Sequence, residues 1–236
     1  RRLRVAFFST GAELVSIGAP LAQGQVYDSN RYTLHGMLSG LGVEIIDLGV
    51  VRDDPEKLEA AFAAAAAKAD AIITTGGVSV GEADFVKQLM AKLGEVLFWK
   101  IAMRPGRPMA FGKIACGGNS AFLFGLPGNP VAVMVTFHQL VRDALLMLGG
   151  RTDAFAIPLL KAVSASAIRK VPGRTEYQRG ILFRDGGAWK VRTTGQQGSG
   201  VLRSMSEANC NIVLEHERGK VEAGEPVSVQ LMAALA

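Results

Sequence analysis

The stretch Ala71-Ile-Ile-Thr-Thr-Gly-Gly-Val-Ser-Val-Gly-Glu-Ala-Asp84 is the most informative part of this chain. It begins with a short, apolar, β-branched run, which is typical of a buried strand in a parallel sheet. Gly76, Gly77 and Gly81 follow, and glycines allow positive φ and let backbone N–H groups face a ligand without an intervening Cβ. A helix that carries two carboxylates is expected next. The pattern therefore predicts an oxyanion or phosphate site where the strand turns into the helix.

The glycine spacing excludes the two commonest nucleotide-binding motifs. The order G-x-G-x-x-G is absent from this loop, and G-x-x-x-x-G-K-[ST] occurs nowhere in the chain. A nicotinamide-dependent dehydrogenase is therefore a remote alternative.

Composition indicates a globular protein with a sizeable core, in one large domain or two small ones. The 236 residues are 49% hydrophobic and 20% charged, and the net charge is +5. The basic excess is modest and no Lys/Arg-rich run with interleaved aromatics occurs, so nucleic acid is not an expected partner. No run of roughly 18 consecutive apolar residues is present, so no membrane span is expected. A site for a small polyanion explains the positive charge equally well.

The cysteines and histidines do not form a recognisable site. Cys116 and Cys210 lie far apart without a C-x-x-C pair, which predicts neither a disulfide framework nor a zinc site. The three histidines are equally scattered. A reducing, cytoplasmic setting fits this pattern best, and metal chemistry is expected only from carboxylates.

The first 150 residues predict a three-layer α/β/α domain with a mostly parallel sheet, because apolar strands alternate with helical segments. Asp28 or Ser29 is expected to cap the first helix, and Asp54 the second. Strands are expected at 3–9, 43–50, 71–75, 96–101, 109–113 and 121–125, and helices at 29–39, from 55 onward, at 83–93 and at 130–148.

The pattern changes after residue 150. Residues 151–236 contain short β-type runs separated by glycines and polar turns, which predicts a second, all-β domain with a small barrel or a sandwich. These runs are expected at 161–165, 177–183, 189–192, 211–214 and 226–231.

Two Pro/Gly loops are expected at the same edge of the sheet as Gly76. They are Arg104-Pro-Gly-Arg-Pro108 and Gly125-Leu-Pro-Gly-Asn-Pro130. In open α/β sheets ligands bind at the carboxyl edge of the strands. The three loops together therefore predict one ligand-binding cleft.

Motifs spread over nearly the whole chain carry a family resemblance. They are Ser9-Thr-Gly-Ala-Glu-Leu14, Tyr27-Asp-Ser-Asn30, Thr74-Thr-Gly-Gly-Val-Ser-Val-Gly-Glu-Ala-Asp84, Trp99-Lys100, Met103-Arg-Pro-Gly-Arg-Pro-Met-Ala-Phe-Gly112, Gly125-Leu-Pro-Gly-Asn-Pro-Val131, Pro172-Gly-Arg-Thr-Glu-Tyr-Gln-Arg-Gly180 and Thr194-Gly-Gln-Gln-Gly-Ser199. Together they resemble the molybdopterin molybdotransferases of the MoeA type, which are similar also to the E domain of gephyrin.

This resemblance implies insertion of molybdate into the dithiolene of adenylylated molybdopterin, with release of AMP and with Mg²⁺ as the helping ion. It also implies a homodimer, and a molybdopterin adenylyltransferase as a candidate partner. Family members carry two further N-terminal domains, whereas this chain opens almost directly on the first strand of the sheet domain. We therefore expect the chain to bind the pterin nucleotide but to turn over poorly alone.

Carried over to this sequence, the resemblance implies Asp28, Asp84, Lys100 and Arg104 as catalytic residues, with the two aspartates as magnesium ligands. The implied substrate-binding residues are Thr75, Gly76, Gly77, Ser79, Glu82, Pro105, Gly106, Pro127, Gly128, Asn129, Arg179 and Ser199. The chemistry agrees, because a molybdate dianion and phosphates require fixed cations and backbone donors. Hard carboxylate oxygens are also what Mg²⁺ prefers.

Plainer structural roles remain open for several of these residues. Asp28, Ser79 and Asn129 could simply cap helices, and Glu82 and Asp84 could complement a helix dipole.

Two other functions remain open. One is that of the sister adenylyltransferase, which shares the sheet domain and would consume ATP, although the β domain and the Gly125–Pro130 loop argue against it. The other is a non-catalytic scaffold of the gephyrin kind.

Overall fold

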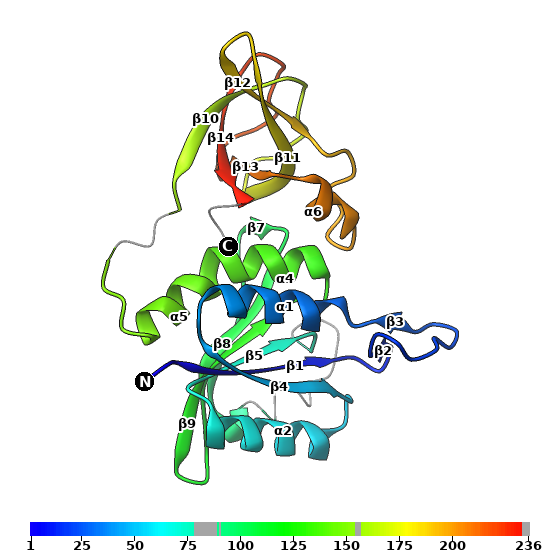
Figure 1. Cartoon of the computed structure of the whole chain (residues 1–236), viewed down its shortest axis with the longest axis vertical. Helices are drawn as coiled ribbons and strands as arrows, with labels where there is room; N and C mark the ends of the chain where they lie inside the picture. The colour runs from blue at the N-terminus through cyan, green and yellow to red at the C-terminus, as the bar shows by residue number, and fades with distance from the viewer. Residues whose placement is uncertain (78–88, 90, 154–156, 233–236) are drawn as a thin grey trace. The chain divides into compact units, whose positions relative to one another are not determined.

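The computed structural model describes residues 1–77, 89, 91–153 and 157–232, and the chain forms two compact units (Figure 1). The first unit comprises Arg1–Ile101 and Pro108–Thr152. The second comprises Ala102–Arg107 and Asp153–Ala236, so a short segment from the middle of the chain belongs to the later unit.

The first unit is built on a six-stranded sheet of order β4-β1-β5-β9-β8-β6. Its strands are β1 (Arg4–Thr10), β4 (Glu44–Val51), β5 (Ala71–Thr75), β6 (Gly94–Lys100), β8 (Pro108–Cys116) and β9 (Asn119–Leu126). The strands β4, β1, β5 and β9 pair in parallel, whereas β8 is antiparallel to both of its neighbours. A two-glycine turn at Gly117 and Gly118, with φ of +57° and +82°, reverses the chain there. The predicted α/β sheet is confirmed.

Helices cover both faces of this sheet (Figure 1). They are α1 (Ser29–Gly40), α2 (Pro55–Lys68), and a last helix made of α4 (Pro130–Thr136), the π-helical turn η1 (Phe137–Val141) and α5 (Arg142–Leu148). Both predicted caps are confirmed, because Asp28 accepts a hydrogen bond from the Arg31 N–H at 3.1 Å and Asp54 from the Lys57 N–H at 3.0 Å. The helix predicted at 83–93 lies mostly outside the described residues.

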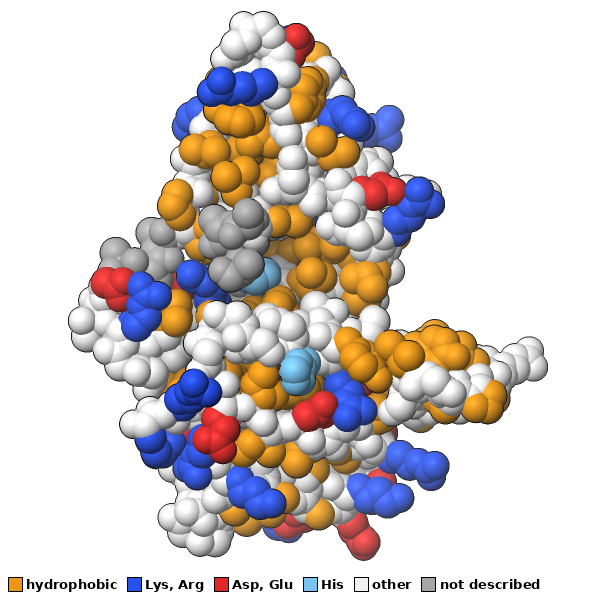
Figure 2. All heavy atoms as spheres, in the orientation of Figure 1, with side chains coloured by type: hydrophobic (Ala, Val, Ile, Leu, Met, Phe, Trp, Pro, Cys, Tyr) orange, Lys and Arg blue, Asp and Glu red, His pale blue; other side chains and the backbone are white. Residues whose placement is uncertain are grey.

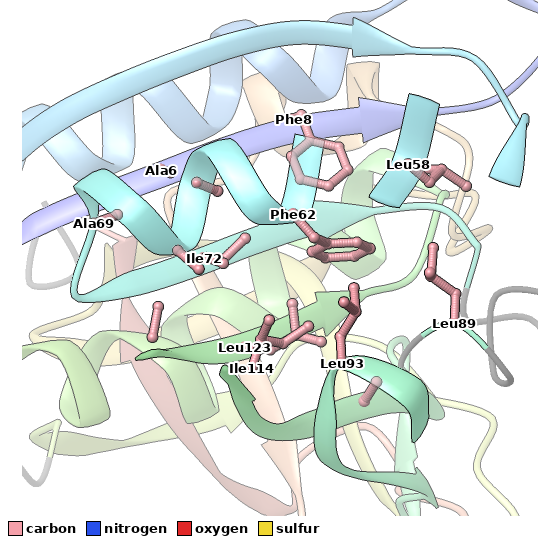
Figure 3. Packing of buried hydrophobic residues seen from close by; sticks show 14 residues of the cluster. Ala6, Phe8, Leu58, Phe62, Ala69, Ile72, Leu89, Leu93, Ile114 and Leu123 are labelled. Carbon is pink, nitrogen blue, oxygen red and sulfur yellow. The ribbon is translucent and has the colours of Figure 1, made fainter. Parts of the chain in front are cut away.

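Alternate residues of β1 supply the two halves of the core. Ala6 and Phe8 face α2, and the Phe8 and Phe62 rings meet edge to face with centroids 5.2 Å apart (Figure 3). Val5 and Phe7 point to the other face, in the cluster that also contains buried residues of α1 and of the last helix. Both faces of the strand are thus buried, which explains its unbroken apolar run.

The helix Pro130–Leu148, of 19 residues, is long and apolar enough to cross a membrane by length and composition, with a mean hydropathy of 1.5 over an 18-residue window. Half of that window is buried inside the protein. Val133, Phe137, Val141 and Leu145 belong to the core cluster under the sheet. Core packing therefore accounts for its apolar composition.

An arm between β1 and α1 was not predicted from the sequence. It contains the two-stranded parallel sheet of β2 (Leu14–Val15) and β3 (Val26–Tyr27). Its apolar side chains gather on its surface (Figure 2), and Ile17 and Leu21 are 57% and 44% exposed. No charged residue lies between Glu13 and Asp28.

The second unit is a closed five-stranded barrel, as the β-type runs allowed. Its strands are β10 (Leu159–Ser164), β11 (Thr175–Asp185), β12 (Ala188–Thr193), β13 (Cys210–Leu214) and β14 (Pro226–Leu231). They pair in the order β12-β10-β14-β13-β11, and a further β11–β12 pairing closes the ring. The short strand β7 (Met103–Arg104) adds to β11 in parallel, and the helix α6 (Arg203–Glu207) lies between β12 and β13 in the chain.

Candidate functional site

Hydroxyl groups gather at the carboxyl edge of the first unit, where β1 and β5 end. The Thr75 hydroxyl donates to the Ser9 hydroxyl at 3.0 Å, and the Thr10 hydroxyl donates to the Thr75 carbonyl at 3.4 Å. The Gly76 N–H then donates to the carbonyl of Leu126, the last residue of β9, at 3.2 Å. Three neighbouring strand ends are therefore joined by hydrogen bonds at this edge.

Gly76 is required here for two reasons. Its φ of +84° is a conformation that side chains with a Cβ rarely adopt, and a Cβ at this position would lie 2.4 Å from the Thr10 carbonyl oxygen. Gly77 also has positive φ, at +67°. A Cβ on Gly128 would be 3.7 Å from the Gly76 Cα, so the end of β1 and the loops after β5 and β9 lie together. The predicted residues Thr75, Gly76 and Gly128 are thus brought together.

Two buried oxygen atoms beside these loops have no hydrogen-bond partner in the described part of the chain. Asp28 is 1% exposed, and while its Oδ1 caps α1, its Oδ2 is left unpaired. Asn30 donates from Nδ2 to the Gly128 carbonyl at 2.7 Å, and its Oδ1 is unpaired. Buried acceptors without partners are costly, and both oxygens are available to a bound donor or a bound cation. Asp28 is a helix cap that keeps one spare oxygen.

Three further predicted residues of the first unit lie at strand or helix ends. Pro127 is buried and Asn129 is exposed at the cap position of α4, but the Asn129 side chain makes no capping hydrogen bond. Lys100 is the last residue of β6, exposed, and opposite Pro108. Among the described residues it has no ion-pair partner.

Glu13 and Asp53 form a carboxylate pair that the sequence interpretation did not single out. Loss of hydration raises the pKa of Asp53, and the Glu13 carboxylate raises it further, while the Ala12 N–H and the Thr10 hydroxyl act in the opposite direction. Glu13 follows β1 and Asp53 follows β4, and these strands are neighbours in the sheet. An acid two or three residues after the end of each of two adjacent parallel strands was the signal that could have revealed the pair.

Ser79, Glu82 and Asp84 lie outside the described residues. Within the part of the chain that the structure describes, no group of three or more His, Cys, Asp or Glu side chains is arranged to hold a metal ion. The magnesium ligand pair predicted from Asp28 and Asp84 therefore remains a prediction.

The second unit contains a cavity of about 380 Å³. Arg104 and Pro105 from the β7 segment and Arg179 from β11 line it, so three predicted residues lie around one space. Gly106 follows in the same segment, buried and with φ of +100°. The other lining residues are Ala167, Ile168, Arg169, Glu176, Tyr177, Gln178, Thr193, Gly195 and Gln197.

The charge of this cavity is positive. Arg179 is only 1% exposed, and neither it nor Arg104 has a carboxylate partner among the described residues. Burial and the nearby Arg104 charge lower the pKa of Arg179 to about 10. The one lining carboxylate, Glu176, already accepts hydrogen bonds from Arg174 at 2.9 Å and from Gln178 at 3.0 Å. Two guanidinium groups without carboxylate partners among the described residues therefore favour an oxyanion ligand.

Ser199 belongs to the loop that follows β12. The preceding residue, Gly198, accepts a hydrogen bond from Arg179 Nη2 at 3.0 Å, which places this loop beside the arginine. Ser199 itself is half-buried and does not line the cavity.

Comparison with known proteins accounts for both units. Residues 6–147 match the family model described as a probable molybdopterin binding domain, and residues 161–232 match the MoeA C-terminal region, or domain IV. The chain belongs to the MoeA family. This agrees with the resemblance inferred from the motifs.

Relatives in the family extend beyond this chain. It is 46% identical to the molybdopterin molybdenumtransferase of Haemophilus influenzae over 98% of its length, but covers 56% of that protein. A relative of the same name from Nostoc sp. is 36% identical, with 97% and 53% covered. The crystal structure of a molybdopterin biosynthesis MoeA protein from Pyrococcus horikoshii matches with a TM-score of 0.80 and 32% identity, covering 98% of this chain and 55% of that one. The chain thus spans about half the length of the curated relatives it matches.

Proposed function

We propose that this chain carries the part of a molybdenumtransferase that binds adenylylated molybdopterin and molybdate, inserts molybdenum into the dithiolene and releases AMP. The observation that carries this proposal is the positive cavity of the second unit, where Arg104 and Arg179 lack carboxylate partners among the described residues. Molybdate is a tetrahedral dianion, and unpaired guanidinium groups are its natural ligands. The names of the curated relatives agree with this chemistry.

In this proposal the two units have different tasks. Arg104 and Arg179 bind molybdate in the second unit, with Pro105, Gly106 and Ser199 shaping the surroundings. In the first unit the glycine loop and the Gly125–Pro130 loop present backbone N–H groups to the phosphates of the pterin nucleotide. Exposed Lys100, at the end of β6, adds a cation for the oxyanions. The remaining proposed contacts of the first unit come from Thr75, Gly76, Gly77, Ser79, Glu82, Pro127, Gly128 and Asn129.

Mg²⁺ fits the carboxylates that this chain offers. The spare buried oxygen of Asp28 is a hard ligand without a partner among the described residues, and Asp84 and the pair of Glu13 and Asp53 supply further carboxylates. Mg²⁺ is commonly held by one or two carboxylates together with water and substrate phosphates, so a larger protein cluster is not required. A bound Mg²⁺ would neutralise charge on the pyrophosphate that links AMP to the pterin.

We further propose that the protein is a homodimer, and that the arm of β2 and β3 contributes to the contact between two copies. The arm exposes apolar side chains and has no charged residue between Glu13 and Asp28. This suits a symmetric contact, because a charged patch on the arm would meet the same charges on the other copy. A cytoplasmic location and an adenylyltransferase that hands over the substrate belong to the same proposal.

The test is molybdate-dependent release of AMP from adenylylated molybdopterin. It should be measured with this chain, and with a longer protein that adds the remaining part of its relatives' length. We expect the longer protein to release AMP only when molybdate and Mg²⁺ are present, and the Arg179→Met variant to lose most of this activity. Consumption of ATP with formation of adenylylated molybdopterin would instead show an adenylyltransferase. Nucleotide binding without any AMP release in either protein would favour the scaffold.

A further inference from the structure

The guanidinium group of Arg179 is held by contacts on two of its three nitrogens. Nε donates to the Ser204 hydroxyl at 3.0 Å, and Nη2 donates to the Gly198 carbonyl at 3.0 Å. Ser204 is 3% exposed and donates its own proton to the Val201 carbonyl at 2.6 Å. Because that proton is committed, the Ser204 oxygen can only accept from Nε.

The third nitrogen, Nη1, is left for the cavity. It makes no hydrogen bond in the part of the chain that the structure describes. It is also not fully buried. Arg179 is almost wholly buried yet lines the cavity, so this nitrogen is available to bind a ligand there. A buried, charged group therefore keeps N–H donors available for an oxyanion in the cavity.

Gln197 holds the backbone of the same residue. Its Oε1 accepts from the Arg179 N–H at 2.7 Å, and its Nε2 donates to the Arg179 carbonyl at 3.1 Å. The side-chain amide thus binds both backbone groups of Arg179, and the carbonyl also accepts from the Thr194 N–H at 3.0 Å. It also ties the loop of Gly198 and Ser199 to β11.

We propose that Gln197 and Ser204 are positioning residues, which hold Arg179 so that its Nη1 is directed at the oxyanion in the cavity. This inference rests on the proposed function, because it assumes that the cavity binds molybdate. An arginine side chain loses considerable rotamer freedom when it is fixed in one geometry. Contacts that already fix it in the free protein remove this cost from binding.

The experiment is a calorimetric titration of the full chain with sodium molybdate in slightly alkaline buffer, where molybdate is a monomeric dianion. Four variants carry the test: Ser204→Ala, Ser204→Thr, Gln197→Met and Arg179→Met. Two matched controls make the same changes nearby. Ser206→Ala lies in the same helix, where the exposed Ser206 hydroxyl donates to the Arg203 carbonyl, and Gln196→Met changes the exposed neighbour of Gln197. Thermal unfolding without molybdate reports the stability of every variant.

We expect Arg179→Met to weaken binding about 100-fold, and Ser204→Ala and Gln197→Met about tenfold, as for residues that orient a ligand-binding group. Ser204→Thr keeps the hydroxyl and should restore binding, which a merely structural role of Ser204 would not require. The controls should bind like the unaltered chain.

The outcomes test the positioning roles and the oxyanion site separately. If Arg179→Met abolishes binding while Ser204→Ala and Gln197→Met bind normally, the positioning roles are wrong and the oxyanion site stands. If Ser204→Thr binds as weakly as Ser204→Ala, the positioning role of Ser204 is wrong as well. If the unaltered chain does not bind molybdate, the proposed cavity site fails and this inference fails with it.

Discussion

Single residues at the carboxyl edge of the first unit are determined by steric and hydrogen-bonding demands. Gly76 combines a positive φ with a close approach to the Thr10 carbonyl. Gly24 has nearly the same φ, +82°, but a Cβ added there would meet nothing within 4 Å. A comparison of alanine substitutions at the two glycines therefore separates the cost of positive φ from the cost of steric contact.

Gly76→Ala should destabilise the chain more than Gly24→Ala. Both substitutions cost about 1 kcal/mol for positive φ, but the alanine methyl at position 76 must also displace the end of β1, for a total of roughly 2–4 kcal/mol. Chemical denaturation of the two variants measures the difference. Equal losses would mean that the loops after β1 and β5 are not in contact in solution.

Asp28 combines a cap with a spare oxygen, and two substitutions distinguish these roles. Asp28→Ala removes the cap and should cost about 1 kcal/mol of stability. Asp28→Asn keeps an oxygen for the Arg31 N–H, so stability should change little, while the negative charge is lost. We expect Asp28→Asn to abolish the Mg²⁺ dependence of adenylylated molybdopterin binding, measured by calorimetry. Unchanged Mg²⁺ dependence in this variant would leave Asp28 with the cap alone.

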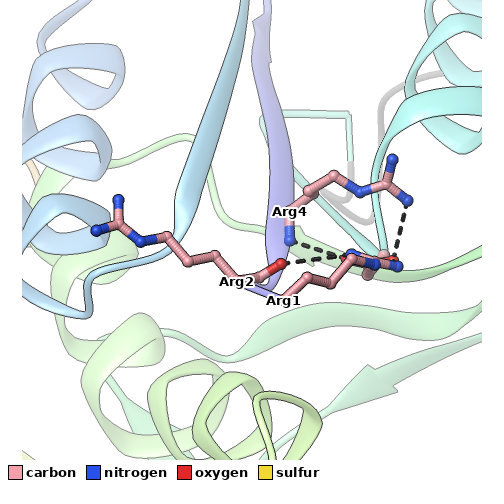
Figure 4. A network of polar contacts seen from close by, with 4 residues as sticks. Arg1, Arg2 and Arg4 are labelled. Atoms are coloured by element: carbon pink, nitrogen blue, oxygen red, sulfur yellow. Dashed lines mark hydrogen bonds and ion pairs between the residues drawn. The ribbon is translucent and has the colours of Figure 1, made fainter.

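Elements of the first unit are held in register by polar contacts at the opposite edge of the sheet (Figure 4). Asp70 precedes β5, and its carboxylate accepts two hydrogen bonds from Arg1 at 2.7 Å and one from the Arg4 N–H at 2.9 Å. Arg1, and after it Arg4, hold the pKa of Asp70 well below its usual range. The start of β5 is thereby fixed against the start of β1.

Asp70→Asn should lower the midpoint of thermal unfolding at neutral pH by about 2–4 °C, equivalent to about 1 kcal/mol. Because the pKa is lowered in the folded state, this stabilisation is complete above the ordinary aspartate pKa of about 3.9 and is lost as the pH falls. The difference between variant and unaltered chain should therefore shrink in acid. Asp185→Asn is the control, because Asp185 is 58% exposed in its pair with Lys190 and should matter less. A difference that is constant with pH would contradict this account.

The whole molecule consists of two units, and the second includes a short segment that interrupts the first in the sequence. The segment Ala102–Arg107 leaves the sheet after β6, adds β7 to the barrel strand β11, and returns as β8. It thereby brings Arg104 to the cavity that contains Arg179. The arm of β2 and β3 is the other large feature that lies outside both cores.

Lysine substitutions in the arm test the proposed dimer. Ile17→Lys and Leu21→Lys together should shift the chain from dimer to monomer, because two copies would then bury like charges against each other. Sedimentation velocity measures the change. Leu159→Lys, at a residue 52% exposed in the second unit, is the matched control and should leave the association unchanged. A chain that is monomeric before any substitution would refute the proposal.

Sequence alone determined the features that depend on neighbouring residues. Short-range patterns predicted the caps at Asp28 and Asp54 and the buried strand before Gly76, and the structure has all of them. The family motifs also predicted Arg104 and Arg179 as site residues, and the structure places both at one cavity.

Only the tertiary structure decided which distant groups meet. No local sequence pattern connects β7 with β11, which pair in the structure. The same holds for Glu13 and Asp53, whose charges interact, and for Gln197 and Ser204, which form hydrogen bonds with Arg179. The unpaired oxygen of Asp28 likewise depends on what surrounds it after folding. The physical reason is that hydrogen-bond partners and the pKa of a group are set by packing between elements, whereas caps and strand periodicity are set within one element.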